Sequence, residues 1–114
     1  MKYLCLVYQE EKEAPNVPKE MWDQAIRDYK AFEADIKKTG HYVGSHGLQG
    51  TNTATTVRVR NGKLSTTDGP FAETKEQLGG YFLIEARDLN EAIQVAARIP
   101  SAKWGSVEVR PVWE

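Results

Sequence analysis

The stretch TDGPFAETKEQLGG, residues 67–80 of the 114-residue chain, decides the fold. Its Asp68-Gly69-Pro70 turn cannot continue a strand or a helix, because a proline restricts the residue before it and has no N–H to donate. Polar residues follow, and the stretch closes on Gly79-Gly80. A connection of this length in a small domain is usually functional or mobile. The pattern predicts a lid-like loop hinged at Gly79-Gly80, with a plain solvated loop as the alternative.

The segments on either side of this stretch predict β-strands. Residues 54–66 alternate apolar and polar positions around Asn61-Gly62, the strongest short signal for a two-residue hairpin turn. Such a turn places Val59 opposite Leu64, so that the apolar residues share one face of the hairpin. Residues 81–86 are apolar on both alternating sets, which is typical of a strand covered on both faces.

Two helices and three further strands complete the predicted pattern. Both helices show apolar residues at helical spacing, and the second opens with the capping box Asp88-x-x-Glu91. The predicted apolar stripes are Trp22, Ala25, Ile26, Tyr29, Phe32 and Ile36 in the first helix, and Leu89, Ala92, Ile93, Ala96 and Ile99 in the second. The elements run in chain order as a strand at 3–8, a helix at 19–39, a strand at 41–49, the hairpin, a strand at 81–86, a helix from 88 and a strand at 105–113.

This order predicts a single α+β domain over residues 1–114 with a ferredoxin-like split βαβ arrangement. Its two helices would pack on one face of an antiparallel sheet. The strands at 3–8 and 81–86 are nevertheless apolar on both faces. Monomers avoid an apolar patch as large as the uncovered face would be. The pattern therefore predicts a homodimer that packs sheet against sheet.

Composition narrows the classes of function. The net charge of −1 and the lack of a basic face argue against binding to nucleic acid or to an anionic membrane. No apolar run approaches the roughly 20 residues of a membrane span. Cys5, the single cysteine, excludes an internal disulfide and fits a reducing cytosol, so we expect a cytoplasmic protein. The chain contains no metal-ligand spacing and no glycine-rich nucleotide motif, so we expect no metal and no cofactor.

Four residues are candidates for a functional site. His46 and Asp68 form a candidate catalytic pair, because a carboxylate can hold an imidazole in the tautomer that acid–base chemistry requires. Arg58, Asp68 and Phe71 are candidate ligand-binding residues in a cleft at the Asp68 end of the hairpin. The structural alternatives are a strand histidine bonded to a backbone carbonyl and a turn aspartate that accepts bonds from the backbone after it.

Three segments resemble a known family. Residues 66–81, TTDGPFAETKEQLGGY, resemble the signature of the DGPF-domain branch of the YCII-related family, and residues 54–58 and 105–112 are similar to the same family. The resemblance implies a dimeric α+β barrel in a small bacterial protein, often encoded near extracytoplasmic-function sigma factors, with no established reaction. The wider family brings a histidine and an aspartate together in a cleft. Asp68 matches that aspartate, whereas the histidine position varies in this branch and His46 is the nearest candidate.

Three functions follow from these observations. The first is a small dimeric protein that binds a small ligand in a cleft near Asp68. The second is an acid–base enzyme of the isomerase or lyase type that uses His46 and Asp68. The third is a regulatory interaction partner of a sigma factor. The sequence leaves open whether the protein is an enzyme and which ligand it binds.

Overall fold

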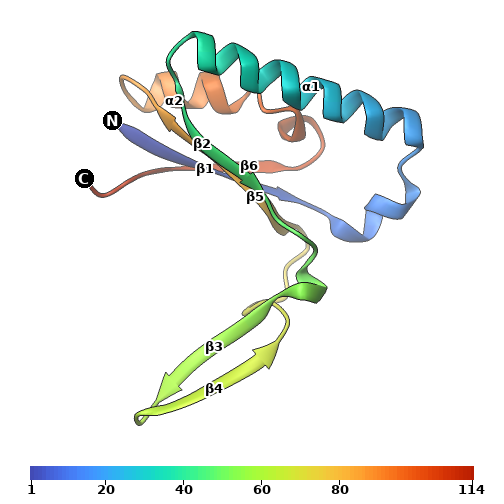
Figure 1. Cartoon of the computed structure of the whole chain (residues 1–114), viewed down its shortest axis with the longest axis vertical. Helices are drawn as coiled ribbons and strands as arrows, with labels where there is room; N and C mark the ends of the chain where they lie inside the picture. The colour runs from blue at the N-terminus through green and yellow to red at the C-terminus, as the bar shows by residue number, and fades with distance from the viewer.

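A computed structural model describes residues 1–114 as a four-stranded antiparallel sheet, two helices on one of its faces and a separate β-hairpin (Figure 1). The sheet has the strand order β2-β5-β1-β6, and β3 pairs only with β4. The predicted α+β, ferredoxin-like fold is therefore confirmed. The elements are β1 (Lys2–Gln9), the 3-10 helix η1 (Glu11–Asn16), α1 (Lys19–Lys38), β2 (Tyr42–Gly47), the 3-10 helix η2 (Thr51–Thr53), β3 (Thr55–Arg60), β4 (Lys63–Asp68), β5 (Gln77–Glu85), α2 (Leu89–Ala96), the 3-10 helix η3 (Pro100–Lys103) and β6 (Ser106–Pro111).

The two strands that are apolar on both faces, β1 and β5, pair with each other at the centre of the sheet. Tyr3, Cys5 and Val7 are buried on the face that the helices cover. The residues between them face the other side, because side chains alternate along a strand. Burial raises the pKa of the Cys5 thiol to about 11, so Cys5 behaves as a small core residue. The core cluster comprises Tyr3, Cys5, Val7, Phe32, Ile36, Phe82, Ile84, Ala86, Ala92, Val95, Ala96 and Ile99.

The uncovered side, called the open face below, carries Leu4 and Leu6 of β1 opposite Leu83 and Tyr81 of β5. All four side chains are only partly buried in the single chain. No helix packs on this side of the sheet in Figure 1. The apolar open face expected from the sequence is therefore present, although the homodimer itself stays a prediction.

A β-bulge in β2 breaks its side-chain alternation. The register with β5 shifts between Tyr42 and Gly44, as the glycines of this segment predicted. The bulge puts Tyr42 and Ser45 on the same side of the strand, where the Tyr42 hydroxyl lies 2.9 Å from Ser45 Oγ. His46 then lies opposite Tyr81 on the open face. The regular alternation expected for residues 41–49 is wrong for this reason.

The hairpin of β3 and β4 has the predicted turn and register. Asn61 and Gly62 both have positive φ angles, 53° and 72°, as a type I′ turn requires, and Val59 lies opposite Leu64. The hairpin projects away from the sheet (Figure 1), and the exposed fraction of the Leu64 side chain is 71 %. The radius of gyration is accordingly 16.0 Å, whereas a compact domain of this length has about 13 Å.

Both helices form, but each buries a narrower stripe than the sequence predicted. Trp22 and Ile26 are 43 % and 50 % exposed, because the first half of α1 extends past the sheet (Figure 1). In α2, Val95 is buried while Leu89 and Ile93 are half-exposed. The interpretation of Trp22 as a core residue is therefore wrong for the single chain, as is that of Leu89 and Ile93.

The predicted hinge at Gly79-Gly80 is also wrong, because both glycines lie inside β5. The carbonyl of Gly79 accepts a hydrogen bond of 2.9 Å from the Leu48 N–H. Gly80 pairs with Val7 on one side and with Gly47 on the other. A Cβ atom on Gly80 would lie 2.8 Å from the His46 carbonyl oxygen, so this position needs glycine for the close approach of β2.

We expect Gly80→Ala to lower the free energy of unfolding by about 1–3 kcal/mol, the usual range for an inserted methyl group that a packed site cannot accept. Chemical denaturation measures this change. Gly44→Ala is the matched control, because a Cβ atom at Gly44 meets nothing within 4 Å. A flexible hinge at Gly79-Gly80 would instead leave both variants equally stable.

Candidate functional site

A cavity of about 280 Å³ opens at the end of the sheet where β2 ends and β5 begins. Its apolar wall consists of Val7, Tyr29 and Phe82, and its backbone wall consists of three glycines in β2 and β5. The polar lining residues are Gln9, Ser45, His46 and Tyr81. This combination of an apolar surface with a few converging polar groups is typical of a small-molecule site.

Tyr29 and Phe82 give the cavity an aromatic wall between α1 and the sheet. Their rings lie parallel, with an interplanar angle of 4° and centroids 6.2 Å apart. The Tyr29 hydroxyl is hydrogen-bonded to Ser101 Oγ, and burial raises the pKa of Tyr29, so this side chain is neutral. The Gln9 side-chain oxygen accepts hydrogen bonds from Ser101 Oγ at 3.3 Å and from Trp104 Nε1 at 3.1 Å. These bonds hold the Gln9 amide at the cavity wall.

His46 lies in the strand that borders this cavity, and on the open face its side chain is paired with that of Tyr81. Its Nδ1 atom is 2.8 Å from the Tyr81 hydroxyl, and the two rings are 5.7 Å apart between centroids. Its Nε2 atom makes no hydrogen bond within the chain, and the residue is exposed. The structural alternative of a strand histidine bonded through its ring to a backbone carbonyl is therefore wrong. The ring is held through one nitrogen and leaves the other available.

Asp68 ends β4 and is exposed, and its carboxylate makes no hydrogen bond or ion pair within the chain. The Gly69 N–H donates instead to the Ala54 carbonyl at 2.8 Å. The interpretation of Asp68 as a cap on the backbone that follows it is therefore wrong. The single chain also forms no hydrogen bond between His46 and Asp68, since the partner of His46 is Tyr81.

Arg58 and Phe71 lie outside the cavity of the single chain. Arg58 is an exposed residue of the hairpin opposite Ser65, on the face that does not carry the apolar residues. Phe71 is 82 % exposed and follows the Asp68 turn. Of the four candidate residues, only His46 lines the cavity. All four nevertheless belong to segments at or beyond the same end of the sheet (Figure 1).

Sequence reasoning missed Tyr81, Tyr29 and Gln9 as cavity residues. Helical spacing places Tyr29 on the apolar stripe of α1, and this spacing gives no sign that its hydroxyl bonds to a serine 72 positions later. The partnership of His46 with Tyr81 depends on the β2 bulge, because the bulge decides which residues of β2 share a face with β5. The bulge could be expected at the β2 glycines, but its register could not.

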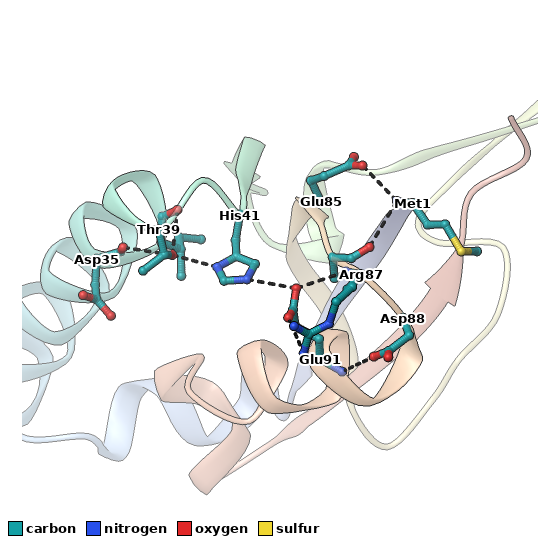
Figure 2. Close-up of polar contacts among 10 residues, drawn as sticks. Met1, Asp35, Thr39, His41, Glu85, Arg87, Asp88 and Glu91 are labelled. Carbon is teal, nitrogen blue, oxygen red and sulfur yellow. Dashed lines mark hydrogen bonds and ion pairs between the residues drawn. The ribbon is translucent and has the colours of Figure 1, made fainter.

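His41, the second histidine, belongs to a polar network that joins the end of α1 to the start of α2 (Figure 2). Its Nδ1 atom lies 2.7 Å from Thr39 Oγ1, and its Nε2 atom lies 3.3 Å from a carboxylate oxygen of Glu91. The same Glu91 oxygen accepts a 3.0 Å hydrogen bond from the Arg87 N–H, and Asp88 accepts one of 2.9 Å from the Glu91 N–H. The predicted capping box is thus present, with Arg87 rather than Asp88 as the backbone donor to Glu91.

The amino-acid sequence can be compared with those of known proteins. The family model of the YCII-related domain matches residues 1–114. The chain belongs to the YCII-related family. An uncharacterized protein of Rhizobium meliloti (strain 1021) is 37 % identical over 114 residues, which cover 98 % of this chain and 92 % of that protein. The finer resemblance to the DGPF branch of the YCII-related family stays a prediction.

Two further findings describe what the YCII-related chain contains. None of its helices combines the length and the apolar character that a membrane crossing requires. No group of three or more His, Cys, Asp or Glu side chains is arranged to hold a metal ion.

The Glu91 network predicts a pH-dependent contribution to stability. The hydrogen bond from the Arg87 N–H, together with the Arg87 charge, lowers the pKa of Glu91 below the ordinary value of a glutamate. A lowered pKa in the folded state stabilises above the unfolded pKa, and this stabilisation is lost as the pH falls through the folded pKa. We therefore expect Glu91→Gln to lower the unfolding temperature at pH 7, and the difference from wild type to shrink below about pH 4.5.

Differential scanning calorimetry from pH 7 to pH 3 measures this difference. Glu73→Gln is the control, because Glu73 is an exposed loop residue without an ion pair. Equal differences between wild type and Glu91→Gln at both ends of the pH range would show that the Glu91 charge does not stabilise the helix junction.

Proposed function

We propose that this YCII-related protein is a homodimer that binds a small ligand at the end of the sheet where the His46 cavity and Asp68 lie. The observation that carries the proposal is the exposed hairpin. An isolated two-stranded hairpin is marginally stable in water. Here the hairpin projects away from the sheet (Figure 1), and its apolar residues Val57, Val59 and Leu64 are exposed. A second copy would cover it.

Two apolar surfaces of the single chain support the dimer. The hairpin exposes Val57 and Val59, each at 59 %, beside Leu64. The open face exposes Leu4 next to Leu83, and Leu6 next to Tyr81. Two-fold symmetry would bring such patches together in pairs, because an isologous interface uses the same surface of both copies. Stable interfaces bury about 1,600 Å² in total, which a sheet face together with a hairpin can supply.

The ligand site is supported by polar groups that the fold itself does not use. His46 Nε2 and the Asp68 carboxylate make no hydrogen bond within the chain, and Arg58 is likewise exposed without an ion pair. Exposed polar residues on loops and strand ends are the usual carriers of binding. Phe71 would add an apolar surface beside them. Arg58, Asp68 and Phe71 are thus the ligand-binding residues that we propose next to the cavity.

Acid–base catalysis of the isomerase or lyase type is the second candidate function. It is favoured by the state of His46, whose Nδ1 atom is held by Tyr81 while Nε2 faces solvent. A ring oriented in this way can accept or donate a proton at one defined nitrogen. Asp68 would have to approach the His46 cavity in the dimer for the predicted pair to act.

The dimer is tested by light scattering on wild type, Leu64→Asp and Ser65→Asp. Wild type is expected at twice the chain mass of 12.8 kDa. Leu64→Asp should be monomeric, because it places a charge on the apolar hairpin face. Ser65→Asp, the matched control on the opposite face, should stay dimeric. A monomeric wild type at micromolar concentration would overturn the dimer.

The ligand site is tested by an amide-resolved NMR screen of small-molecule fragments on the wild-type protein. Binding is expected to shift the amide signals of His46, Gly47 and Asp68 together, because the proposal places them around one site. Signals of the Glu91 network serve as the internal control and should stay in place. A screen in which no fragment shifts the first group would remove the binding function.

A further inference from the structure

We infer that the cavity beside His46 takes an uncharged aromatic molecule of one or two rings with a single polar substituent. This inference names the ligand class of the site proposed above and rests on that proposal. It draws on three properties of the cavity: its size, its aromatic wall and its lack of charged side chains.

The cavity has this size because glycines occupy positions where larger side chains would fill it. Gly47 and Gly80 are direct partners in the β2–β5 ladder, and both line the cavity. A Cβ atom on Gly47 would meet nothing within 4 Å, so open space reaches the backbone there. An apolar cavity of about 150 Å³ is enough to bind benzene, and sites for drug-sized ligands begin near 300 Å³. The volume of about 280 Å³ therefore fits one or two rings.

The aromatic wall of the cavity favours a ligand with a flat aromatic ring. Tyr29 and Phe82, which both line the cavity, lie parallel at 6.2 Å between centroids. Phe32 packs edge-on against Phe82 with centroids 5.1 Å apart, which fixes the Phe82 ring. Aromatic pairs in offset or edge-to-face arrangements gain attraction beyond the area they bury. A flat aromatic ligand can use this gain, whereas a saturated ring of the same size cannot.

The polar lining groups favour an uncharged ligand. No Lys, Arg, Asp or Glu side chain lines the cavity. An ionised ligand would therefore lose its water without gaining a charged partner, which is unfavourable. The Gln9 side-chain oxygen is already bonded to Ser101 and Trp104, which leaves its amide N–H groups as donors. A hydroxyl or carbonyl substituent can accept a hydrogen bond from this amide.

Phenol is the probe, with cyclohexanol and benzoate as the comparison molecules and amide NMR titration as the measurement. Phenol is expected to shift the signals of Gly47, Gly80 and Tyr81, with cyclohexanol about three- to tenfold weaker, since it lacks the aromatic contacts. Gly47→Val should abolish phenol binding by filling the cavity. Gly44→Val is the matched control, because Gly44 has the same open surroundings but does not line the cavity.

Thermal unfolding of both variants shows that they fold, and Gly47→Ala replaces Gly47→Val if the larger side chain does not. Phenol binding that survives a folded Gly47 variant would overturn the assignment to this cavity. If benzoate binds as tightly as phenol and its affinity falls in Arg58→Ala, the inference of an uncharged ligand is overturned. The proposed binding function would remain intact. If neither phenol nor any fragment of the screen shifts the amide signals of Gly47, Gly80 and Tyr81, the aromatic ligand class and the proposed binding function both fail.

Discussion

The pairing of β1 with β5 is the constraint on which the rest of the structure depends. Both strands are apolar on both faces, and their register places Cys5 opposite Phe82 and Leu6 opposite Tyr81. One set of side chains is buried by α1 and α2, while the other set stays on the open face. Two helices cannot cover both faces of one sheet. The strand pair that builds the core thus also creates a surface that a second copy can cover.

The hairpin and the cavity follow from how β5 begins. Because β5 starts at Gln77, the glycines at 79 and 80 are used for close strand packing rather than for a hinge, and they leave space beside Tyr29. The residues before β5 return from a hairpin that projects away from the sheet. Asp68 and His46 are consequently brought to the same end of the sheet without touching each other. In our proposal, the second copy and the ligand bring His46 and Asp68, which are apart in the single chain, into one site.

Much of the fold could be predicted, because it depends on local signals. Helical spacing, the Asn61-Gly62 turn and the two-residue alternation of the hairpin each specify a backbone conformation within a few residues, and the structure confirms them. The candidate site could be predicted less completely, because it depends on strand register and on helix placement. The partnership of His46 with Tyr81 requires a bulge of known position, and the exposure of Trp22 reflects how far α1 extends beyond the sheet. The periodicity of the sequence specifies neither the position of the bulge nor the extension of α1 beyond the sheet.

Amide hydrogen exchange of the β3–β4 hairpin, measured at a series of protein concentrations, tests most directly whether a second copy covers it. The amides of β1 and β5 provide the reference for a protected core. At high concentration, the amides of residues 55–68 should approach this protection, and the protection should fall on dilution as dimers dissociate. Hairpin amides that exchange rapidly at every concentration, while β1 and β5 stay protected, would contradict the claim that this fold is completed by a second copy.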